Sequence, residues 1–205
     1  LVCGSVTACL DVTFDLHEDE VLGIVGESGS GKSTLIRLLY FEEDPSEGKI
    51  FMNGDDNFGE KQDVLGFTPF PKRQLRSHRM GIVYQNPHLG LRMGISAGGN
   101  VAEKVLEAKW RHVGRIRERA GELMTKTEIP LSRMDEPPRN FSGGMQQRVQ
   151  IAKALANSPK ILLLDEVTTG LDLSVQARVL DLIRGLQRDL RLSVIVVSHD
   201  LSVIR

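Results

Sequence analysis

A glycine-rich run that ends in a lysine and two hydroxyl residues reads Gly26-Glu27-Ser28-Gly29-Ser30-Gly31-Lys32-Ser33-Thr34. An apolar run, Val21–Val25, comes directly before it, and a helical pattern begins at Ser33. Glycines at these spacings let successive backbone N–H groups converge on phosphate oxygens at the positive end of a helix. Lys32 supplies a point charge for the β- and γ-phosphates, and the Ser33 hydroxyl is placed for Mg²⁺. The run therefore predicts a loop that binds the phosphates of a nucleotide.

A second apolar run, Ile161–Leu164, ends in two neighbouring carboxylates, Asp165 and Glu166. A buried parallel strand delivers the side chains at its C-terminal end to the sheet edge where ligands bind. Asp165 at this edge can hold Mg²⁺ through water, and Glu166 can accept the proton of a water that attacks the γ-phosphate. Beside a phosphate-binding loop, this pair predicts a site for phosphate-bond hydrolysis.

Apolar runs alternate with helical patterns along much of the chain. The runs Gly81–Tyr84 and Val194–Val197 resemble the two already described, and such runs are typical of strands buried on both faces of a parallel sheet. Helical periodicity lies between the runs, at Ser33–Tyr40, Met145–Asn157 and Val175–Asp189.

The early part of the chain has a different strand pattern. Val12, Phe14 and Leu16 alternate with polar residues, and Lys49–Gly54 predicts another strand that ends at a turn. We therefore expect an α/β fold that combines a parallel-sheet core with an N-terminal antiparallel β layer.

The composition is that of an ordinary globular domain, with 26 Lys and Arg residues against 27 Asp and Glu residues in 205. The net charge of −1 gives no general argument for nucleic-acid binding, and 40% hydrophobic residues exclude a disordered chain. The apolar runs are too short for a transmembrane helix or a signal-peptide core. Cys3 and Cys9 have no metal-like spacing and favour a reduced, cytoplasmic protein over a disulfide scaffold.

The middle of the chain is basic and predominantly helical in pattern. Gly59–Arg79 predicts a loop with a short helix. Val101–Ile129 predicts long helical material, whose start Gly98-Gly99-Asn100 would cap. Glu103–Arg119 contains six Lys and Arg residues against three Glu residues. This segment is either a solvated helical face or a docking surface for an acidic partner or nucleic acid.

A third motif, Asn140–Arg148, contains Ser142-Gly143-Gly144 at the start of a helical pattern. Ser142 is a natural N-cap, and the two glycines permit the close approach of an anion. At this point the chain resembles the ATP-binding cassette (ABC) family, whose signature reads Leu-Ser-Gly-Gly-Gln. Phe141 and Met145 stand at the first and fifth places of that signature.

The resemblance extends over almost the whole chain. Gln85 matches the Q-loop glutamine of the family, Thr169-Gly170-Leu171-Asp172 matches the D-loop, and His199 matches the switch histidine. The resemblance implies a P-loop NTPase fold that binds ATP and Mg²⁺ and hydrolyses ATP. The implied organisation is one domain, 1–205, with a RecA-like core at about 1–90 and 155–205 and a helical subdomain at about 91–154.

The family pairs two such domains head-to-tail, so that each ATP lies between one P-loop and the signature helix of the other subunit. The resemblance therefore implies that Ser142 and Gly144, with Gly143 between them, contact the nucleotide of the other subunit, and that Asp172 crosses the interface. The implied catalytic residues are Glu166, His199 and Gln85, and the implied metal ligands are Ser33, Gln85 and Asp165.

A narrower similarity is to the K-type ATP-binding subunit of the phosphonate carbon–phosphorus lyase system, in Tyr84–Arg92, Ile95–Val101, Phe141–Arg148 and Leu173–Arg178. It implies a cassette dimer that docks on carbon–phosphorus lyase core subunits, with no permease and no direct membrane insertion. The segment after the Q-loop is where cassette proteins usually meet a partner. One alternative is the ATP-binding subunit of a di/oligopeptide or nickel importer, whose partner is a permease. The others are a cassette protein that binds nucleic acid and an ATP sensor without hydrolysis, and the intact Lys32, Asp165, Glu166 and His199 argue against the sensor.

The chain departs from the family pattern at three places. Residues Leu1–Leu10 contain no aromatic side chain to stack on adenine, Val167 stands where proline is usual, and Asp19 replaces a glycine in the turn before Glu20. Neither Val167 nor Asp19 is a phosphate ligand, so we expect hydrolysis to persist. Because cassette domains continue beyond the switch histidine, we also expect this chain to be truncated at both ends.

Overall fold

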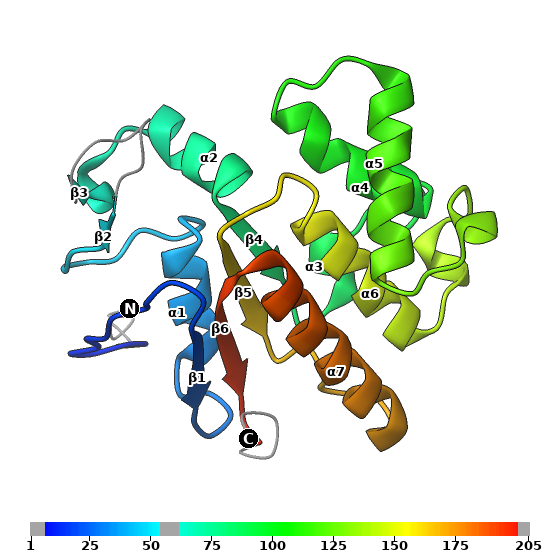
Figure 1. The fold of residues 1–205 in the computed structure, drawn as a ribbon. Coiled ribbons are helices and arrows are strands. Elements are labelled where there is room, and N and C mark those ends of the chain that lie inside the picture. Colours follow the sequence, from blue (N-terminus) through cyan, green and yellow to red (C-terminus); the bar gives the residue numbers. More distant parts are fainter. Residues whose placement is uncertain (1–6, 54–61, 201–205) are drawn as a thin grey trace, which may run out of the picture.

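The computed structural model describes residues 7–53 and 62–200 (Figure 1). The expectations that concern Cys3, Gly54 and the first residues of the Gly59–Arg79 segment lie outside this part of the chain.

A four-stranded parallel sheet forms the centre, in the order β1-β6-β5-β4. Its strands are β1 (Val21–Val25), β4 (Met80–Val83), β5 (Ile161–Asp165) and β6 (Ser193–Ser198). Val21 pairs with Val194, and Ile161 pairs with both Ser193 and Met80. The carboxyl ends of all four strands therefore meet at one edge, and the parallel-sheet core expected from the sequence is confirmed. The expected burial on both faces is wrong for β1, because it lies at the edge of the sheet and its end residues Val21 and Val25 are exposed.

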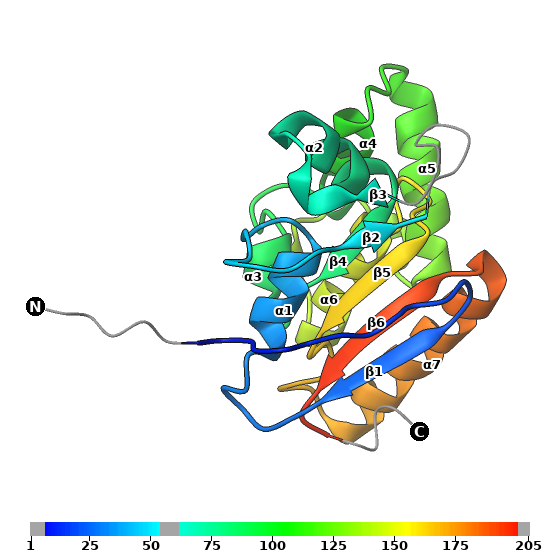
Figure 2. The same cartoon turned by 90° about the vertical axis from the view of Figure 1, so that its left-hand side faces the viewer.

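Helices cover both faces of the sheet, with α1 and α7 on opposite sides (Figure 2). Successive side chains of a strand point to opposite faces, and this alternation divides the core into two buried clusters. On one face, Ile36 of α1 (Lys32–Leu39) belongs to a cluster with Leu163, Ile195 and Val197. On the other, α6 (Gly143–Ala154) and α7 (Leu173–Leu190) pack in a cluster that includes Val149, Val179, Leu162, Leu164, Val194 and Val196.

A separate two-stranded antiparallel sheet consists of β2 (Phe51–Met52) and β3 (Gln62–Asp63). The expected strand through Val12, Phe14 and Leu16 is wrong, because this segment is extended but belongs to no strand. Phe14 and Leu16 are only partly buried and pack against the cluster on the α1 face. Their alternation therefore records packing on one side without a hydrogen-bonded neighbour strand.

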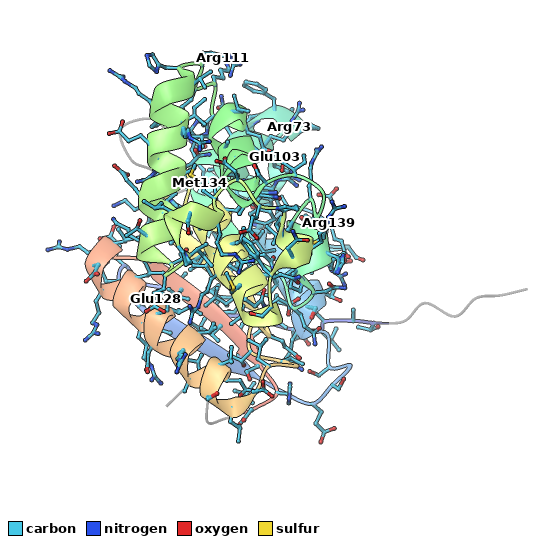
Figure 3. The ribbon with its side chains drawn as sticks, turned by 90° about the vertical axis from the view of Figure 1, so that its right-hand side faces the viewer. Arg73, Glu103, Arg111, Glu128, Met134 and Arg139 are labelled. Atoms are coloured by element: carbon cyan, nitrogen blue, oxygen red, sulfur yellow. The ribbon has the colours of Figure 1, made fainter. Side chains whose placement is uncertain are left out.

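Helices fill the middle of the chain: α2 (Pro69–His78), α3 (Pro87–Gly90), α4 (Ala97–Glu107) and α5 (Val113–Lys126), with 3₁₀ turns at Val64–Gly66, Leu131–Arg133 and Pro138–Asn140. The long helical material expected over Val101–Ile129 forms two helices, because Lys109 adopts a left-handed φ of 64° and His112 caps a new helix. The expected cap is also corrected: the Ser96 side chain accepts from the Gly99 N–H, so the glycines lie inside the first turn. Figure 3 shows this helical part of the chain, with Arg111 at the top of the view, Glu103 below it and Glu128 lower still.

Within residues 7–53 and 62–200, the longest helices are too short or too polar to cross a membrane.

Candidate active site

The phosphate-binding run forms a turn between β1 and α1, as the sequence predicts. Gly29 and Gly31 adopt φ values of 81° and 89°, which side-chain-bearing residues rarely adopt. Lys32 is 7% exposed, and its Nζ donates to the carbonyl oxygens of Gly26 at 2.8 Å and Glu27 at 2.6 Å. The loop therefore wraps around the Lys32 ammonium group, whose positive charge lies at the N-terminus of α1.

The segment before β1 lies against the start of this helix. A Cβ built on Gly31 would come within 2.0 Å of the Ala8 carbonyl oxygen, and the Cys9 thiol lies 3.4 Å from the Gly31 carbonyl oxygen. Gly31 is thus required both by its φ and by close contact with another part of the backbone.

Ser33 and Asp165 meet at the carboxyl edge of the sheet. The Ser33 hydroxyl donates to Asp165 Oδ1 at 2.8 Å, although 132 residues separate them in sequence. Burial raises the pKa of Asp165, an effect that the Ser33 hydrogen bond opposes and the neighbouring Glu166 charge reinforces. Hydroxyl and carboxylate oxygens are suitable ligands for Mg²⁺, which usually keeps several waters and binds few protein groups. In the described part of the chain, no group of three or more His, Cys, Asp or Glu side chains is arranged for a metal.

Glu166 stands directly after β5, where the backbone turns sharply. Its φ is 45°, in the left-handed region, and its N–H donates to the Val197 carbonyl oxygen at 3.0 Å. Its Oε2 accepts from Gln85 Nε2 at 3.2 Å and from the Thr169 hydroxyl at 3.1 Å, and it lies 3.2 Å from His199 Nδ1. Side chains from three separate segments therefore converge on one carboxylate oxygen.

The second oxygen of Glu166 faces the phosphate-binding loop. Glu166 Oε1 lies 3.7 Å from Lys32 Nζ, and the two side chains are 13% and 6% exposed. The structure thus gathers six of the residues predicted for the site at one sheet edge: Lys32, Ser33, Gln85, Asp165, Glu166 and His199.

The signature residues lie elsewhere, at the N-terminus of α6. Ser142 caps that helix by accepting from the Met145 N–H at 3.4 Å. A Cβ on Gly143 would lie 3.3 Å from Leu171 in the D-loop, and a Cβ on Gly144 would lie 2.5 Å from Val175 in the first turn of α7. The structure therefore places the signature motif against the D-loop and the start of α7.

Asp172 occupies the N-cap position of α7 and is exposed. Its side chain makes no capping hydrogen bond. The carboxylate therefore extends into solvent beside the signature residues, where a second molecule can reach it.

Two buried glutamines that sequence reasoning did not assign connect α6 to the site. Gln150 Nε2 donates to the Tyr84 carbonyl oxygen at 3.1 Å, and Gln150 Oε1 accepts from the Tyr84 N–H at the same distance. Gln147 Nε2 donates to the Tyr84 oxygen at 3.3 Å and to the Val167 oxygen at 3.0 Å. These amides fix the backbone immediately before Gln85 and immediately after Glu166. Gln147 and Gln150 are three residues apart, so they share one side of the helix, and apolar residues lie next to Gln150 in the sequence. This pattern is the signal that could have found them.

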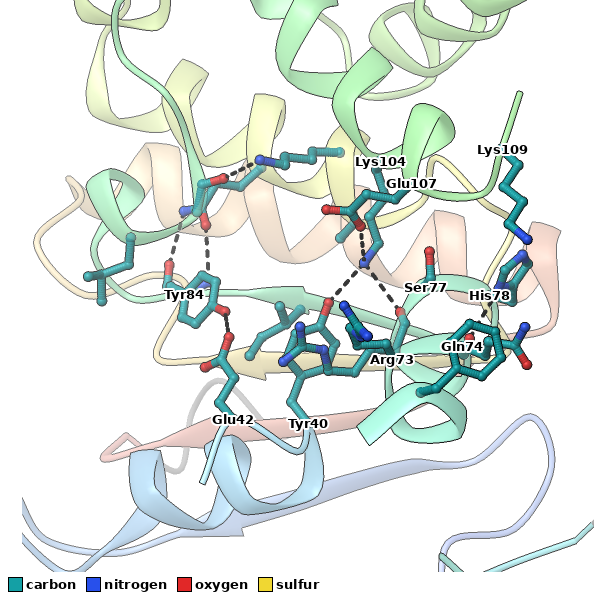
Figure 4. A pocket seen from close by; sticks show the side chains of 18 residues that line it. Tyr40, Glu42, Arg73, Gln74, Ser77, His78, Tyr84, Lys104, Glu107 and Lys109 are labelled. Atoms are coloured by element: carbon teal, nitrogen blue, oxygen red, sulfur yellow. Dashed lines mark hydrogen bonds and ion pairs between the residues drawn. The ribbon is translucent and has the colours of Figure 1, made fainter. Parts of the chain in front are cut away.

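A cavity of about 560 Å³ opens beside this connection, between α2, α4 and the residues around Tyr84 (Figure 4). Its lining includes Arg73, Arg76, His78, Lys104, Lys109 and Lys153, against two carboxylates, Glu42 and Glu107. Lys104 is 8% exposed, and its Nζ donates to the Tyr40 hydroxyl at 3.1 Å and to the Arg76 carbonyl oxygen at 3.2 Å.

The cavity wall also contains Tyr84, whose hydroxyl donates to Glu42. Burial, together with this acidic neighbour, raises the pKa of Tyr84. The Ser77 hydroxyl, which is buried in the same wall, has no hydrogen-bond partner among residues 7–53 and 62–200. The cavity therefore combines an excess of cationic groups with an unsatisfied polar group.

Comparisons with known proteins agree with this geometry. A sequence model described as ABC transporter matches residues 9–169. The phosphonates utilization ATP-binding protein PhnK of Escherichia coli (strain K12) is 47% identical over 195 residues, which cover 95% of this chain and 75% of PhnK. The peptide import ATP-binding protein BAB2_1052 of Brucella abortus (strain 2308) is 39% identical over 207 residues, which cover 98% of this chain and 60% of that protein.

Among solved structures, the ATP-binding cassette MJ0796, a dimer in a post-hydrolysis state bound to ADP and Pi, has a TM-score of 0.82 to this chain at 31% identity. The similarity covers 96% of this chain and 82% of MJ0796. The chain therefore matches most of a known cassette, but only about 60% of the length of the peptide-import relative.

Proposed function

This chain belongs to the ABC transporter family of ATPase domains, and we propose that Glu166 is the general base of its ATP hydrolysis. The observation that carries the proposal is the convergence of Lys32, Gln85 and His199 on the Glu166 carboxylate at the carboxyl edge of the sheet. A base must lie within hydrogen-bond reach of the attacking water, and this carboxylate is next to the group that would bind the γ-phosphate.

The remaining residues of the site have defined tasks in this proposal. Lys32 Nζ and the N–H groups at the start of α1 bind the β- and γ-phosphates of ATP. Ser33 and Asp165, with Gln85, would hold Mg²⁺, which would supply positive charge to neutralise the phosphate oxygens. Glu166 takes the proton of the attacking water, while Gln85 and His199 orient that water and the γ-phosphate.

We propose that two copies of the chain pair head-to-tail. Ser142, Gly143 and Gly144 lie at the start of α6 against Leu171 and Val175, and in this proposal they reach a phosphate across an interface with another molecule. Asp172, exposed beside them, would cross the same interface. The dimeric state of MJ0796, which carries the same overall fold, supports this arrangement.

The proposed client is a phosphonate-utilisation system, with carbon–phosphorus lyase core subunits as the cytoplasmic partner. The similarity to PhnK, 47% over 95% of the chain, supports it. The second candidate is a peptide importer whose partner is a permease, and the 39% identity to BAB2_1052 over 98% of the chain favours that reading.

We propose that the partner binds at the cationic cavity through an acidic segment. Carboxylates of a partner can pair with Arg73 and Lys109, which are exposed at its rim, while the buried Lys104 contributes charge from its wall. Tyr84 lines the same cavity and directly precedes Gln85. A partner that displaces Tyr84 can therefore also displace Gln85, because one peptide bond joins the two residues.

The catalytic proposal is tested with Glu166→Gln. This change keeps the side-chain shape and removes the base, so ATP binding should persist while turnover falls by about 10²–10⁴-fold. The control is Glu118→Gln, a change on the exposed surface of α5 that should leave turnover within twofold. Brisk turnover by the Glu166 variant would show that another group accepts the proton.

The client is tested by affinity purification of the tagged chain from cells grown on a phosphonate as phosphorus source. Recovery of lyase core subunits supports the first candidate, and recovery of a permease supports the second. Arg73→Glu combined with Lys109→Glu should reduce recovery at least tenfold without loss of ATPase activity. Arg178→Glu, an exposed charge reversal on α7, should leave recovery unchanged.

A further inference from the structure

We propose that Thr169 is a positioning residue for the Glu166 carboxylate. The inference rests on the proposed role of Glu166 as the base, and it concerns a side chain that neither touches the phosphates nor binds the metal in that proposal. The Thr169 hydroxyl donates to Glu166 Oε2 at 3.1 Å.

The two residues are tied together twice within one tight turn. The Thr169 N–H donates to the Glu166 carbonyl oxygen at 3.0 Å, and the hydroxyl of the same residue binds the Glu166 side chain. Glu166 itself has a left-handed φ of 45°, a conformation that a side-chain-bearing residue keeps only when its surroundings hold it. The turn therefore fixes both the backbone and the carboxylate of the base.

The other groups around this carboxylate arrive from separate segments. Gln85 follows β4, His199 follows β6, and Lys32 belongs to α1. In the proposed reaction, each of these groups must also interact with phosphate, metal or water, so its contact with Glu166 changes during turnover. Thr169 is only three residues from Glu166, and its contact depends on the turn alone. It can therefore hold the carboxylate in place while the other partners exchange.

Thr169 is also well suited to hold a fixed direction. A β-branched side chain has few χ1 rotamers, so its hydroxyl is held with little residual freedom. The residue is half-buried, and the Glu166 side chain is 13% exposed, which keeps water from competing fully for the carboxylate. A hydroxyl that donates to a carboxylate is among the stronger hydrogen bonds in proteins.

Thr169→Val tests the proposal, because valine keeps the branched shape and removes only the donor. We expect kcat for ATP to fall about tenfold, equivalent to about 1.4 kcal/mol in the barrier, with the KM for ATP unchanged within twofold. Thr169→Ser, which keeps the hydroxyl but loses the methyl group, should restore at least half of the wild-type kcat.

Thr125→Val is the matched control. Its hydroxyl donates to the Gly121 carbonyl oxygen at 3.0 Å on the exposed surface of α5, so its loss should leave both kcat and KM unchanged. Melting temperatures of all variants show whether a lower rate reflects unfolding. A Thr169→Val protein with wild-type kcat, or one whose serine counterpart is equally slow, contradicts the proposal.

A second measurement uses the Glu166→Gln background. If Thr169 acts through the Glu166 carboxylate, adding Thr169→Val to Glu166→Gln should change the residual turnover by less than twofold. An undiminished tenfold loss in this background would show that Thr169 acts on another group. The two proposals fail separately: rapid turnover by Glu166→Gln overturns the base, whereas an inert Thr169→Val beside an inactive Glu166→Gln overturns only the positioning role.

Discussion

Gly144→Ala tests whether the signature motif is held against α7 by close packing. Gly144 is buried in the first turn of α6, and a Cβ added there would lie 2.5 Å from Val175 Cγ1. Carbon atoms in contact are normally about 3.5–4.0 Å apart, so roughly 1 Å of movement is needed between the two helix starts.

The expected loss of stability follows from two opposing effects. Overpacking of this kind costs about 1–3 kcal/mol, whereas alanine in place of glycine in a helix contributes up to about 1 kcal/mol. We therefore expect Gly144→Ala to lower the free energy of unfolding by about 1–2 kcal/mol. Val175→Ala removes the methyl groups on the opposite side of the contact and should cost about 1 kcal/mol by itself.

The double variant distinguishes close packing from other causes. The added methyl group of Gly144→Ala should occupy the space that Val175→Ala leaves, so the double variant should be at least 1 kcal/mol more stable than the sum of the single effects. Urea unfolding of the four proteins, with equal m-values, measures this difference. Additive effects would refute the proposed contact. Both Gly144→Ala and the double variant should have a lower ATPase rate than the wild type, because the proposed phosphate contact of Gly144 requires the absence of a side chain.

Three further changes test individual ion pairs and backbone conformations. Glu103→Gln should lower the free energy of unfolding by about 1 kcal/mol at pH 7. Burial alone would raise the pKa of Glu103, but Lys153 and Arg92 outweigh burial and lower the pKa. The difference from wild type in urea unfolding should therefore be complete above about pH 4.3 and vanish as the pH falls through the folded-state pKa. Asp19 has a φ of 59° in the turn before β1, so Asp19→Gly should raise and Asp19→Ala should lower the free energy of unfolding, by about 0.5–1 kcal/mol each. Urea unfolding measures both changes, and the reverse order would contradict the left-handed turn. Gly31→Ala would place a Cβ 2.0 Å from a backbone oxygen at a φ of 89°, so ATP binding measured by fluorescence titration should be lost, and wild-type affinity would show that the N-terminal segment moves aside.

The parallel core could be predicted because its signal is local. Strands buried on both faces must be apolar throughout, and the run at Ile161–Leu164 records that requirement directly. The run at Val21–Val25 marks a strand at the edge of the sheet, where Val21 and Val25 are exposed. Residues Gly26–Thr34 and Asp165-Glu166 could be placed for a related reason, since each motif directly follows an apolar strand. The convergence of Ser33 on Asp165 then follows from the parallel arrangement of the strands.

The errors concern features that depend on non-local partners. Phe14 and Leu16 pack on the sheet from an extended segment that does not pair as a strand, whereas Val12, the first residue of the alternation, is exposed. The break between α4 and α5 depends on the left-handed φ of Lys109, and lysine has no particular preference for that conformation that would predict it. Asp19 is the opposite case, because a residue that stands where the family has glycine does adopt a left-handed φ.

The spacing of Gln147 and Gln150 places both on one side of α6, but their partners could not be predicted from the sequence, because these are backbone atoms of distant segments that accept or donate hydrogen bonds. Gln147 and Gln150 of α6 hold the carbonyl oxygen of Tyr84, and Gln147 also holds that of Val167. Those two residues adjoin Gln85 and Glu166, the water-orienting residue and the base of the proposed mechanism. A displacement of α6 therefore acts on both at once. Because the N-terminus of α6 is the part that would meet the nucleotide of a second molecule, the same helix can report nucleotide binding at the interface to the residues that hydrolyse ATP.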